Sequence, residues 1–139
     1  MNIYYLVEGE LSLENQSSVV KKVVRQSKVW IEEGNEVLVF SLQSGLYLDV
    51  NKNEIFKFGY AYRKRSSALS KLMLIWFNSL KIFNFLKSSP PDVVYSRLLL
   101  YTPFIEFIAR KWPTIIEVNS YEKREYAGSA YSTFTRIYT

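Results

Sequence analysis

Hydrophobic residues occur along this chain in two alternating patterns, which predict two kinds of secondary structure. Short apolar runs rich in Val, Ile, Leu, Tyr and Phe are typical of strands, and apolar residues that recur every three or four positions are typical of helices. The run at residues 54–62 alternates between apolar and polar residues and is therefore expected to form a strand at a sheet edge. A loop is expected before it, at residues 43–50. The runs predict five strands, at residues 2–7, 36–42, 54–62, 92–96 and 114–118.

Helical spacing predicts three helices between these strands. The first is capped by Ser17 or Ser18 and ends at Gly34. The second helix spans residues 66–87, and the third begins after Thr102, which caps it. Further apolar residues widen the stripe of this second helix beyond what one core contact needs, but its lysines leave no charge-free run long enough to span a bilayer. The stripe is formed by Leu69, Leu72, Met73, Trp76, Leu80 and Phe83.

Strands that alternate with helices predict a parallel sheet, because each helix carries the chain back to the same edge. We therefore expect an α/β fold, a Rossmann-like three-layer sandwich with strand order 3-2-1-4-5. The length of 139 residues suits one domain with a sizeable core, so residues 1–139 are expected to form a single domain. The topological switch point would lie between the first and fourth strands.

Composition excludes several kinds of chemistry. The chain has no cysteine and no histidine, which excludes disulfides, thiolate nucleophiles, imidazole acid–base catalysis and zinc sites built on sulfur or imidazole. Any metal would need oxygen ligands, and we predict neither a metal site nor a cofactor. The lack of cysteine fits a reducing compartment, and the first residues resemble a strand rather than a signal peptide. The expected location is the cytoplasm.

Positive charge is concentrated in one segment of the chain. The net charge is +5, and residues 57–91 contain seven basic and no acidic residues around the apolar second helix. This combination favours an anionic membrane surface at the inner face of a membrane, and no nucleic-acid partner is expected. An equally weighted alternative is that the apolar stripe packs on the sheet and on another domain, with solvated lysines. The candidate membrane contacts are Arg63, Lys64, Arg65, Lys71, Trp76 and Phe77.

Polar side chains follow the strands that flank the expected switch point, where ligands bind in open α/β sheets. A glutamate there can hydrogen-bond sugar hydroxyls, an arginine can hold a phosphate, and an asparagine can orient an acceptor. The alternatives are structural: Glu122 caps its own helix, Arg97 pairs with Glu122 or Glu117, and Glu8 is merely solvated. The acceptor-binding candidates are Glu8, Glu10, Arg97, Asn119 and Glu122.

Common nucleotide and hydrolase motifs do not occur in the sequence. There is no Gly-x-Gly-x-x-Gly after the first strand, no Walker A loop and no Gly-x-Ser-x-Gly elbow. Without histidine, no serine triad can form. Phosphorelay receiver domains share the architecture but need an acidic cluster and an aspartate that ends a strand, whereas Asp92 begins one. Dinucleotide oxidoreduction and serine hydrolysis are therefore not expected.

Three segments together resemble the amino-terminal domain of family 4 glycosyltransferases, which have the GT-B fold. They are residues 19–37, with Gly34-Asn35-Glu36-Val37 where the family usually has Gly-His-Glu-Val; Pro91-Asp92-Val93-Val94-Tyr95-Ser96-Arg97; and Ile116-Glu117-Val118-Asn119 with Glu122. The chain departs from the family at Asn119, where many relatives have histidine, and at Gln16-Ser17-Ser18, where they have a glycine-rich loop. The resemblance implies an acceptor-binding domain that faces a second Rossmann domain carrying the nucleotide-sugar donor.

The resemblance thus implies that residues 1–139 are the acceptor-side portion of a retaining glycosyltransferase, incomplete as a domain and inactive alone. The donor motif belongs to a carboxyl-terminal domain that these residues lack. The implied partners are a sugar or lipid-linked acceptor, and a nucleotide sugar only through that other domain. An unfinished sheet edge also favours a homo-oligomer. The alternative function is a non-catalytic Rossmann-like module for binding or membrane docking.

Overall fold

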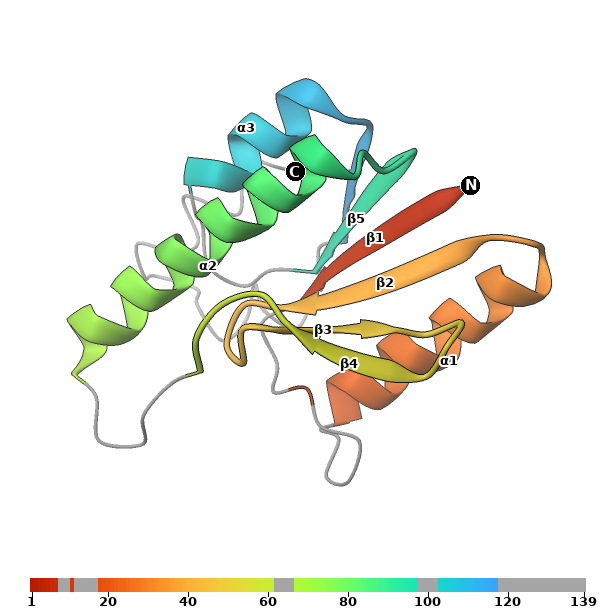
Figure 1. Ribbon diagram of the computed structural model, residues 1–139, viewed down its shortest axis with the longest axis horizontal. Helices are drawn as coiled ribbons and strands as arrows, with labels where there is room; N and C mark the ends of the chain where they lie inside the picture. Colours follow the sequence, from red (N-terminus) through yellow and green to blue (C-terminus); the bar gives the residue numbers. More distant parts are fainter. Residues whose placement is uncertain (8–10, 12–17, 62–66, 98–102, 118–139) are drawn as a thin grey trace.

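A computed structural model describes residues 1–7, 11, 18–61, 67–97 and 103–117 of the chain. Figure 1 shows a twisted sheet with helices on both of its sides. The elements in chain order are β1 (Asn2–Val7), α1 (Ser18–Glu32), β2 (Glu36–Ser41), β3 (Leu46–Asp49), β4 (Glu54–Lys57), α2 (Ala68–Ser88), β5 (Val93–Arg97), α3 (Pro103–Lys111) and β6 (Thr114–Ile116).

The predicted α/β class is confirmed, but the sheet is mixed and its strand order differs from 3-2-1-4-5. Six described strands follow the order β4-β3-β2-β1-β5-β6. The pairs β1–β2, β1–β5 and β5–β6 are parallel, whereas β2–β3 and β3–β4 are antiparallel. An extra strand, β3, therefore separates β2 from the predicted third strand, which does lie at the sheet edge.

The turn after β2 explains why the expected loop at residues 43–50 instead contains a strand. The Gly45 N–H donates to the Ser41 carbonyl at 3.0 Å, and Gly45 has a φ of 64°, which a residue with a side chain rarely adopts. This connection is too short for a crossover, so the chain must return antiparallel. The Phe58 and Gly59 N–H groups both donate to the Gly45 carbonyl. The predicted third strand consequently ends at Lys57 rather than at residue 62.

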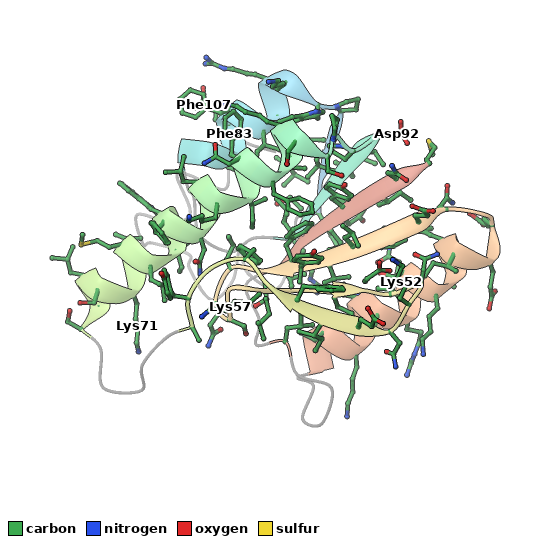
Figure 2. The ribbon with its side chains drawn as sticks, in the orientation of Figure 1. Lys52, Lys57, Lys71, Phe83, Asp92 and Phe107 are labelled. Atoms are coloured by element: carbon green, nitrogen blue, oxygen red, sulfur yellow. The ribbon has the colours of Figure 1, made fainter. Side chains whose placement is uncertain are left out.

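The side chains of β1 divide the core into two layers because successive residues of a strand face opposite sides. Ile3, Tyr5 and Val7 pack with α1 on one face of the sheet. Tyr4 and Leu6 pack on the other face, where α2 and α3 lie together. Figure 2 shows Phe83 of α2 beside Phe107 of α3, and their ring centroids are 6.5 Å apart.

The orientation of α2 differs from the prediction, because much of the apolar stripe points away from the core. The buried residues of α2 are Ile75, Asn78, Ser79, Ile82 and Leu86. Four members of the predicted stripe are exposed instead: Leu69 by 67%, Met73 by 63%, Trp76 by 42% and Leu80 by 38%.

Hydrogen bonds from Asn78 account for this rotation of the helix. The Asn78 Nδ2 donates to the carbonyls of Leu42 and Tyr60 at 2.7 and 2.9 Å, and its Oδ1 accepts from the Tyr60 N–H at 3.1 Å. These three bonds turn Asn78 inward, and the next residue, Ser79, is buried beside it. Gly59 leaves room for this contact, because a Cβ there would overlap the Asn78 side chain. A pattern of apolar residues alone cannot reveal such an anchor.

Candidate functional site

The carboxyl ends of β1, β5 and β6 meet at one edge of the sheet, because these strands are parallel neighbours. β1 is also the point at which the strand order changes direction: the chain proceeds from β1 to β2, β3 and β4 on one side and returns to β5 on the other. In open α/β sheets, ligands bind outside the carboxyl ends of the strands at such a point. The side chains that gather there form the candidate functional site.

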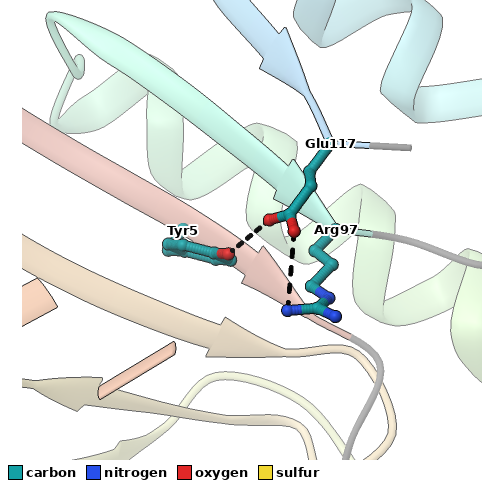
Figure 3. Close-up of polar contacts among 3 residues, drawn as sticks. All are labelled: Tyr5, Arg97 and Glu117. Atoms are coloured by element: carbon teal, nitrogen blue, oxygen red, sulfur yellow. Dashed lines mark hydrogen bonds and ion pairs between the residues drawn. The ribbon is translucent and has the colours of Figure 1, made fainter. Parts of the chain in front are cut away.

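Strand register places Tyr5, Arg97 and Glu117 on the same face of the sheet. Val7 is paired with Arg97, and Tyr5 with Tyr95, so Tyr5 and Arg97 both face α1. The N–H of Glu117 donates to the Ser96 carbonyl at 2.9 Å, which holds Glu117 directly after β6 and beside the end of β5. Figure 3 shows the side chains of Tyr5 and Arg97 converging on the Glu117 carboxylate from β1 and β5.

The Glu117 carboxylate links the other two side chains. The Tyr5 hydroxyl donates to Glu117 Oε2 at 3.2 Å, and Arg97 Nη1 lies 3.7 Å from Glu117 Oε1. The Arg97 side chain is only 9% exposed, and its Nη1 makes no hydrogen bond within the part of the chain that the structure describes. The buried guanidinium therefore faces the Glu117 carboxylate and is placed to hold it at the end of the sheet.

Burial and the neighbouring Glu117 carboxylate both raise the pKa of Tyr5 and so favour its neutral phenol. The loss of solvent raises the pKa of Tyr5 well above its ordinary value of 10, and the negative Glu117 and its hydrogen bond raise this pKa further. The positive charge of Arg97 lowers the pKa, but by less than the other causes raise it. Tyr5 therefore remains a hydrogen-bond donor to Glu117 at every physiological pH.

Aromatic rings surround the buried end of this cluster. The Tyr5 ring centroid lies 4.8 Å from that of Tyr95 and 5.8 Å from that of Trp30 in α1. Tyr95 and Trp30 also contact each other, with centroids 5.3 Å apart. These rings exclude water from the Tyr5 side of Glu117, which strengthens the polar contacts there.

An open pocket of about 500 Å³ lies above the cluster, between α1 and the β5–β6 side of the sheet. The ring of Tyr95 and the carboxylate of Glu117, which is 24% exposed, provide its base. Two cationic side chains of α1, both exposed, stand on its rim. The pocket thus combines cations, one carboxylate and an aromatic surface, a set suited to a small anionic or hydroxyl-rich molecule. Its lining residues are Lys22, Arg25, Gln26, Val29, Tyr95 and Glu117.

A second pocket, of about 270 Å³, lies at the opposite, amino-terminal edge of the sheet. Several of its polar groups make hydrogen bonds within the fold. The Tyr4 hydroxyl donates to the Ser89 carbonyl at 2.9 Å, and Asn51 Oδ1 accepts from the Val37 N–H at 3.0 Å. We therefore take the pocket at the carboxyl edge as the candidate site. Among the described residues, no group of three or more Asp or Glu side chains is placed to hold a metal ion.

One of the predicted acceptor-binding residues lies in the described part of the chain. Arg97 is at the carboxyl end of β5, and the alternative prediction that it pairs with Glu117 is confirmed. The other four candidates, Glu8, Glu10, Asn119 and Glu122, lie outside the described residues.

Sequence reasoning missed most of the side chains at the pocket. Tyr5 and Tyr95 share a face with Arg97 because each lies two positions from a residue at a strand end. Lys22 and Arg25 are three positions apart on α1 and therefore adjacent on one side of the helix. The spacing of two along a strand and of three along a helix is present in the sequence. It shows that these residues lie near one another only when the pairing of the strands is known.

The predicted membrane contacts divide in a similar way. Arg63, Lys64 and Arg65 lie outside the described residues. Trp76 and Phe77 of α2 are 42% and 39% exposed. Lys71 is partly exposed, and it lies two positions from both Leu69 and Met73, which places it on another side of the helix. Figure 2 shows Lys71 extending from the first half of α2. Within the described residues, no helix is both long and apolar enough to cross a membrane.

Comparison of the chain with protein-family models, with curated proteins and with solved structures found no match in any of the three. The resemblance to family 4 glycosyltransferases therefore rests on the sequence motifs alone.

Proposed function

We propose that this chain is the acceptor-side portion of a retaining glycosyltransferase and binds its acceptor in the pocket at the carboxyl edge of the sheet. The observation that supports this most is the pocket itself, in which the exposed cations Lys22 and Arg25 of α1 share the lining with the partly exposed carboxylate of Glu117. The cations donate hydrogen bonds and the carboxylate accepts them, as recognition of a hydroxyl-rich or phosphorylated acceptor requires.

The chain's own residues would bind and orient the acceptor in this proposal. Glu117 accepts from an acceptor hydroxyl while Tyr5 and Arg97 hold the carboxylate in place, since both contact it from the buried side. Lys22 and Arg25 attract an anionic acceptor to the pocket. Stabilisation of the leaving nucleotide diphosphate would come from another domain, so residues 1–139 alone are expected to transfer no sugar.

Ligand-observed and ¹⁵N-labelled NMR titrations test this proposal with two defined probes, methyl α-glucoside and glucose 1-phosphate. Lys22→Ala with Arg25→Ala should weaken binding of the phosphate probe at least about fivefold, because both cations line the pocket. A matched control is Lys21→Ala with Lys28→Ala, which removes the same charge from exposed positions of α1 outside that lining.

Shifts at Tyr95 and Glu117 on addition of either probe would support the site. No shift with either probe, or equal losses in the two double variants, would contradict it. A parallel incubation with a nucleotide sugar and methyl α-glucoside is expected to give no glycoside, and donor-dependent product would contradict the assignment of the chain to the acceptor side alone.

A further inference from the structure

Residues 69–80 of α2 carry an exposed apolar surface, here called the α2 face. Its residues recur three or four positions apart along one side of the helix, opposite the buried Ile75, Asn78 and Ile82. Tyr60, which is 56% exposed, extends the surface by stacking on Phe77 with ring centroids 5.6 Å apart. The α2 face consists of Tyr60, Leu69, Met73, Trp76, Phe77 and Leu80.

The α2 face lies at the same edge of the sheet as the candidate site. Asn78 is hydrogen-bonded to the carbonyl of Leu42, the residue that follows β2, so the turns of α2 before Asn78 extend past the carboxyl end of that strand. Figure 1 shows the beginning of α2 projecting beyond the sheet in this direction. A capped start defines this projection, because Ser67 Oγ accepts from the Ser70 N–H at 3.2 Å.

Cations are held beside the aromatic rings of the α2 face. Lys81 Nζ lies 5.3 Å from the centroid of the Phe77 ring, and Lys57 Nζ lies 5.2 Å from that of Tyr60. The sequence contains no acidic residue from position 57 to position 91 that would neutralise them locally. The surface is thus apolar and aromatic with a positive border.

From this combination we propose that the α2 face docks on an anionic lipid bilayer, with α2 lying on the surface of the bilayer. Aromatic side chains are favoured at the depth of the lipid headgroups, and lysines beside them pair with anionic headgroups. No described helix is suited to cross the bilayer, so this contact is peripheral.

The positive border of the α2 face favours an anionic bilayer over a second copy of the chain or a protein partner. A two-fold dimer through the α2 face would bring Lys57 and Lys81 of both copies to one interface, and like charges across an interface oppose association. A protein partner would need an acidic border around an apolar surface, whereas an anionic bilayer supplies both properties at once. Docking itself does not depend on the proposed function. If both hold, the acceptor is one that a lipid carries, because the bilayer and the pocket then lie at the same edge of the sheet.

Vesicle sedimentation with the full chain tests the proposal, using phosphatidylcholine alone and phosphatidylcholine with about 30% phosphatidylserine. Binding is expected only to the anionic vesicles, and raising the salt concentration from about 0.1 M to about 0.5 M should weaken it at least tenfold. Trp76→Gln with Phe77→Gln should also reduce binding about tenfold, because it removes the rings that insert between headgroups.

A charge-matched pair of variants separates the α2 face from net charge. Lys57→Glu with Lys81→Glu should lower binding at least tenfold, whereas Lys21→Glu with Lys28→Glu, the same charge change on α1 across the sheet, should lower it less than threefold. Equal losses, binding to neutral vesicles, or no vesicle binding by a folded sample would each overturn the proposal. Sedimentation equilibrium tests whether a second copy of the chain binds the α2 face instead. A dimer that dissociates on Trp76→Gln substitution would also overturn the docking proposal.

The two proposals fail independently. Lys22→Ala with Arg25→Ala should remove binding of glucose 1-phosphate and leave vesicle binding within about threefold of the unmodified chain, because these residues lie on the other face of the sheet. Loss of vesicle binding in the α2 variants with intact binding of the sugar phosphate would show that docking and acceptor recognition use separate surfaces, as we expect.

Discussion

The two halves of α2 differ in a way that composition does not reveal. The second half packs Ile82 and Leu86 into the aromatic core, together with the polar Asn78 and Ser79. The first half leaves Leu69 and other large apolar side chains in solvent. One helix therefore buries an amide and a hydroxyl while it exposes leucine and tryptophan. The comparison teaches that hydrogen bonding at a single position can decide which side of an apolar helix faces the core.

Replacing a leucine by alanine in each half of α2 should give the largest difference in the free energy of unfolding. Leu86→Ala should lower the free energy of unfolding by about 2–5 kcal/mol, because Leu86 is fully buried and its loss leaves a cavity. Leu69→Ala is the matched control in the same helix, and at 67% exposure it should change this free energy by less than about 0.5 kcal/mol. Urea denaturation followed by circular dichroism measures both, and similar values for the two variants would contradict the described rotation of α2.

The anchor that orients the helix should have the next largest effect. Asn78→Ala should lower the free energy of unfolding by about 2–3 kcal/mol, because the Leu42 carbonyl and the Tyr60 backbone lose their partners in a buried place. Asn84→Ala, an exposed asparagine of the same helix, should cost less than about 0.5 kcal/mol. If thermal or urea denaturation gives equal costs for the two variants, Asn78 is not the residue that orients α2.

A smaller effect is expected for the buried polar contact on the other face of the sheet. Tyr5→Phe should lower the free energy of unfolding by about 1 kcal/mol near neutral pH, because it removes the hydrogen bond to Glu117. Since the pKa of Tyr5 is higher in the folded chain than in the unfolded one, the stability from its neutral form is complete below pH 10, the ordinary tyrosine value. This part is lost as the pH rises above 10, so the variant should lose less stability there than the unmodified chain.

Urea denaturation from pH 8 to pH 11 measures this difference. Tyr60→Phe changes an exposed phenol and is the control, which should follow the unmodified chain. Two variants with the same decline above pH 10 would show that Tyr5 does not carry the proton linkage. The result would sharpen the comparison between two buried polar groups. It gives the contribution of the Tyr5 hydroxyl, which lies at the candidate site, to the free energy of unfolding, beside that of Asn78, which orients α2.

Much of the fold follows from local sequence patterns. The β1–α1–β2 unit was predicted because its strands are continuous apolar runs and its helix ends before a glycine, and the parallel neighbours β5 and β6 follow from the same rule. β3 was missed because residues 43–50 contain turn-forming and polar residues, and a strand of four residues leaves little periodic signal. The sequence does not show that the turn at Gly45 is tight enough to reverse the chain within the same sheet.

The candidate site was predictable only in part. Arg97 was found because it follows a strand beside the switch point, where topology alone selects a position. Tyr5 was predicted only as part of the strand at residues 2–7, and its role becomes visible only when the register brings it beside Glu117. The pocket cations on α1 depend on how that helix is rotated over the sheet. Such relations between distant segments are set by tertiary packing rather than by local pattern.

The central position of β1 has a consequence for the order in which the molecule is assembled during synthesis. Among the described elements, β1 is synthesised before the others, and the strands that cover one of its edges, β2 and then β3 and β4, follow before α2. Its other edge is filled only by β5, which is made after the whole of α2. The nascent chain can therefore form a four-stranded half-sheet with α1 early, while the other edge of β1 stays unpaired until β5 has been made.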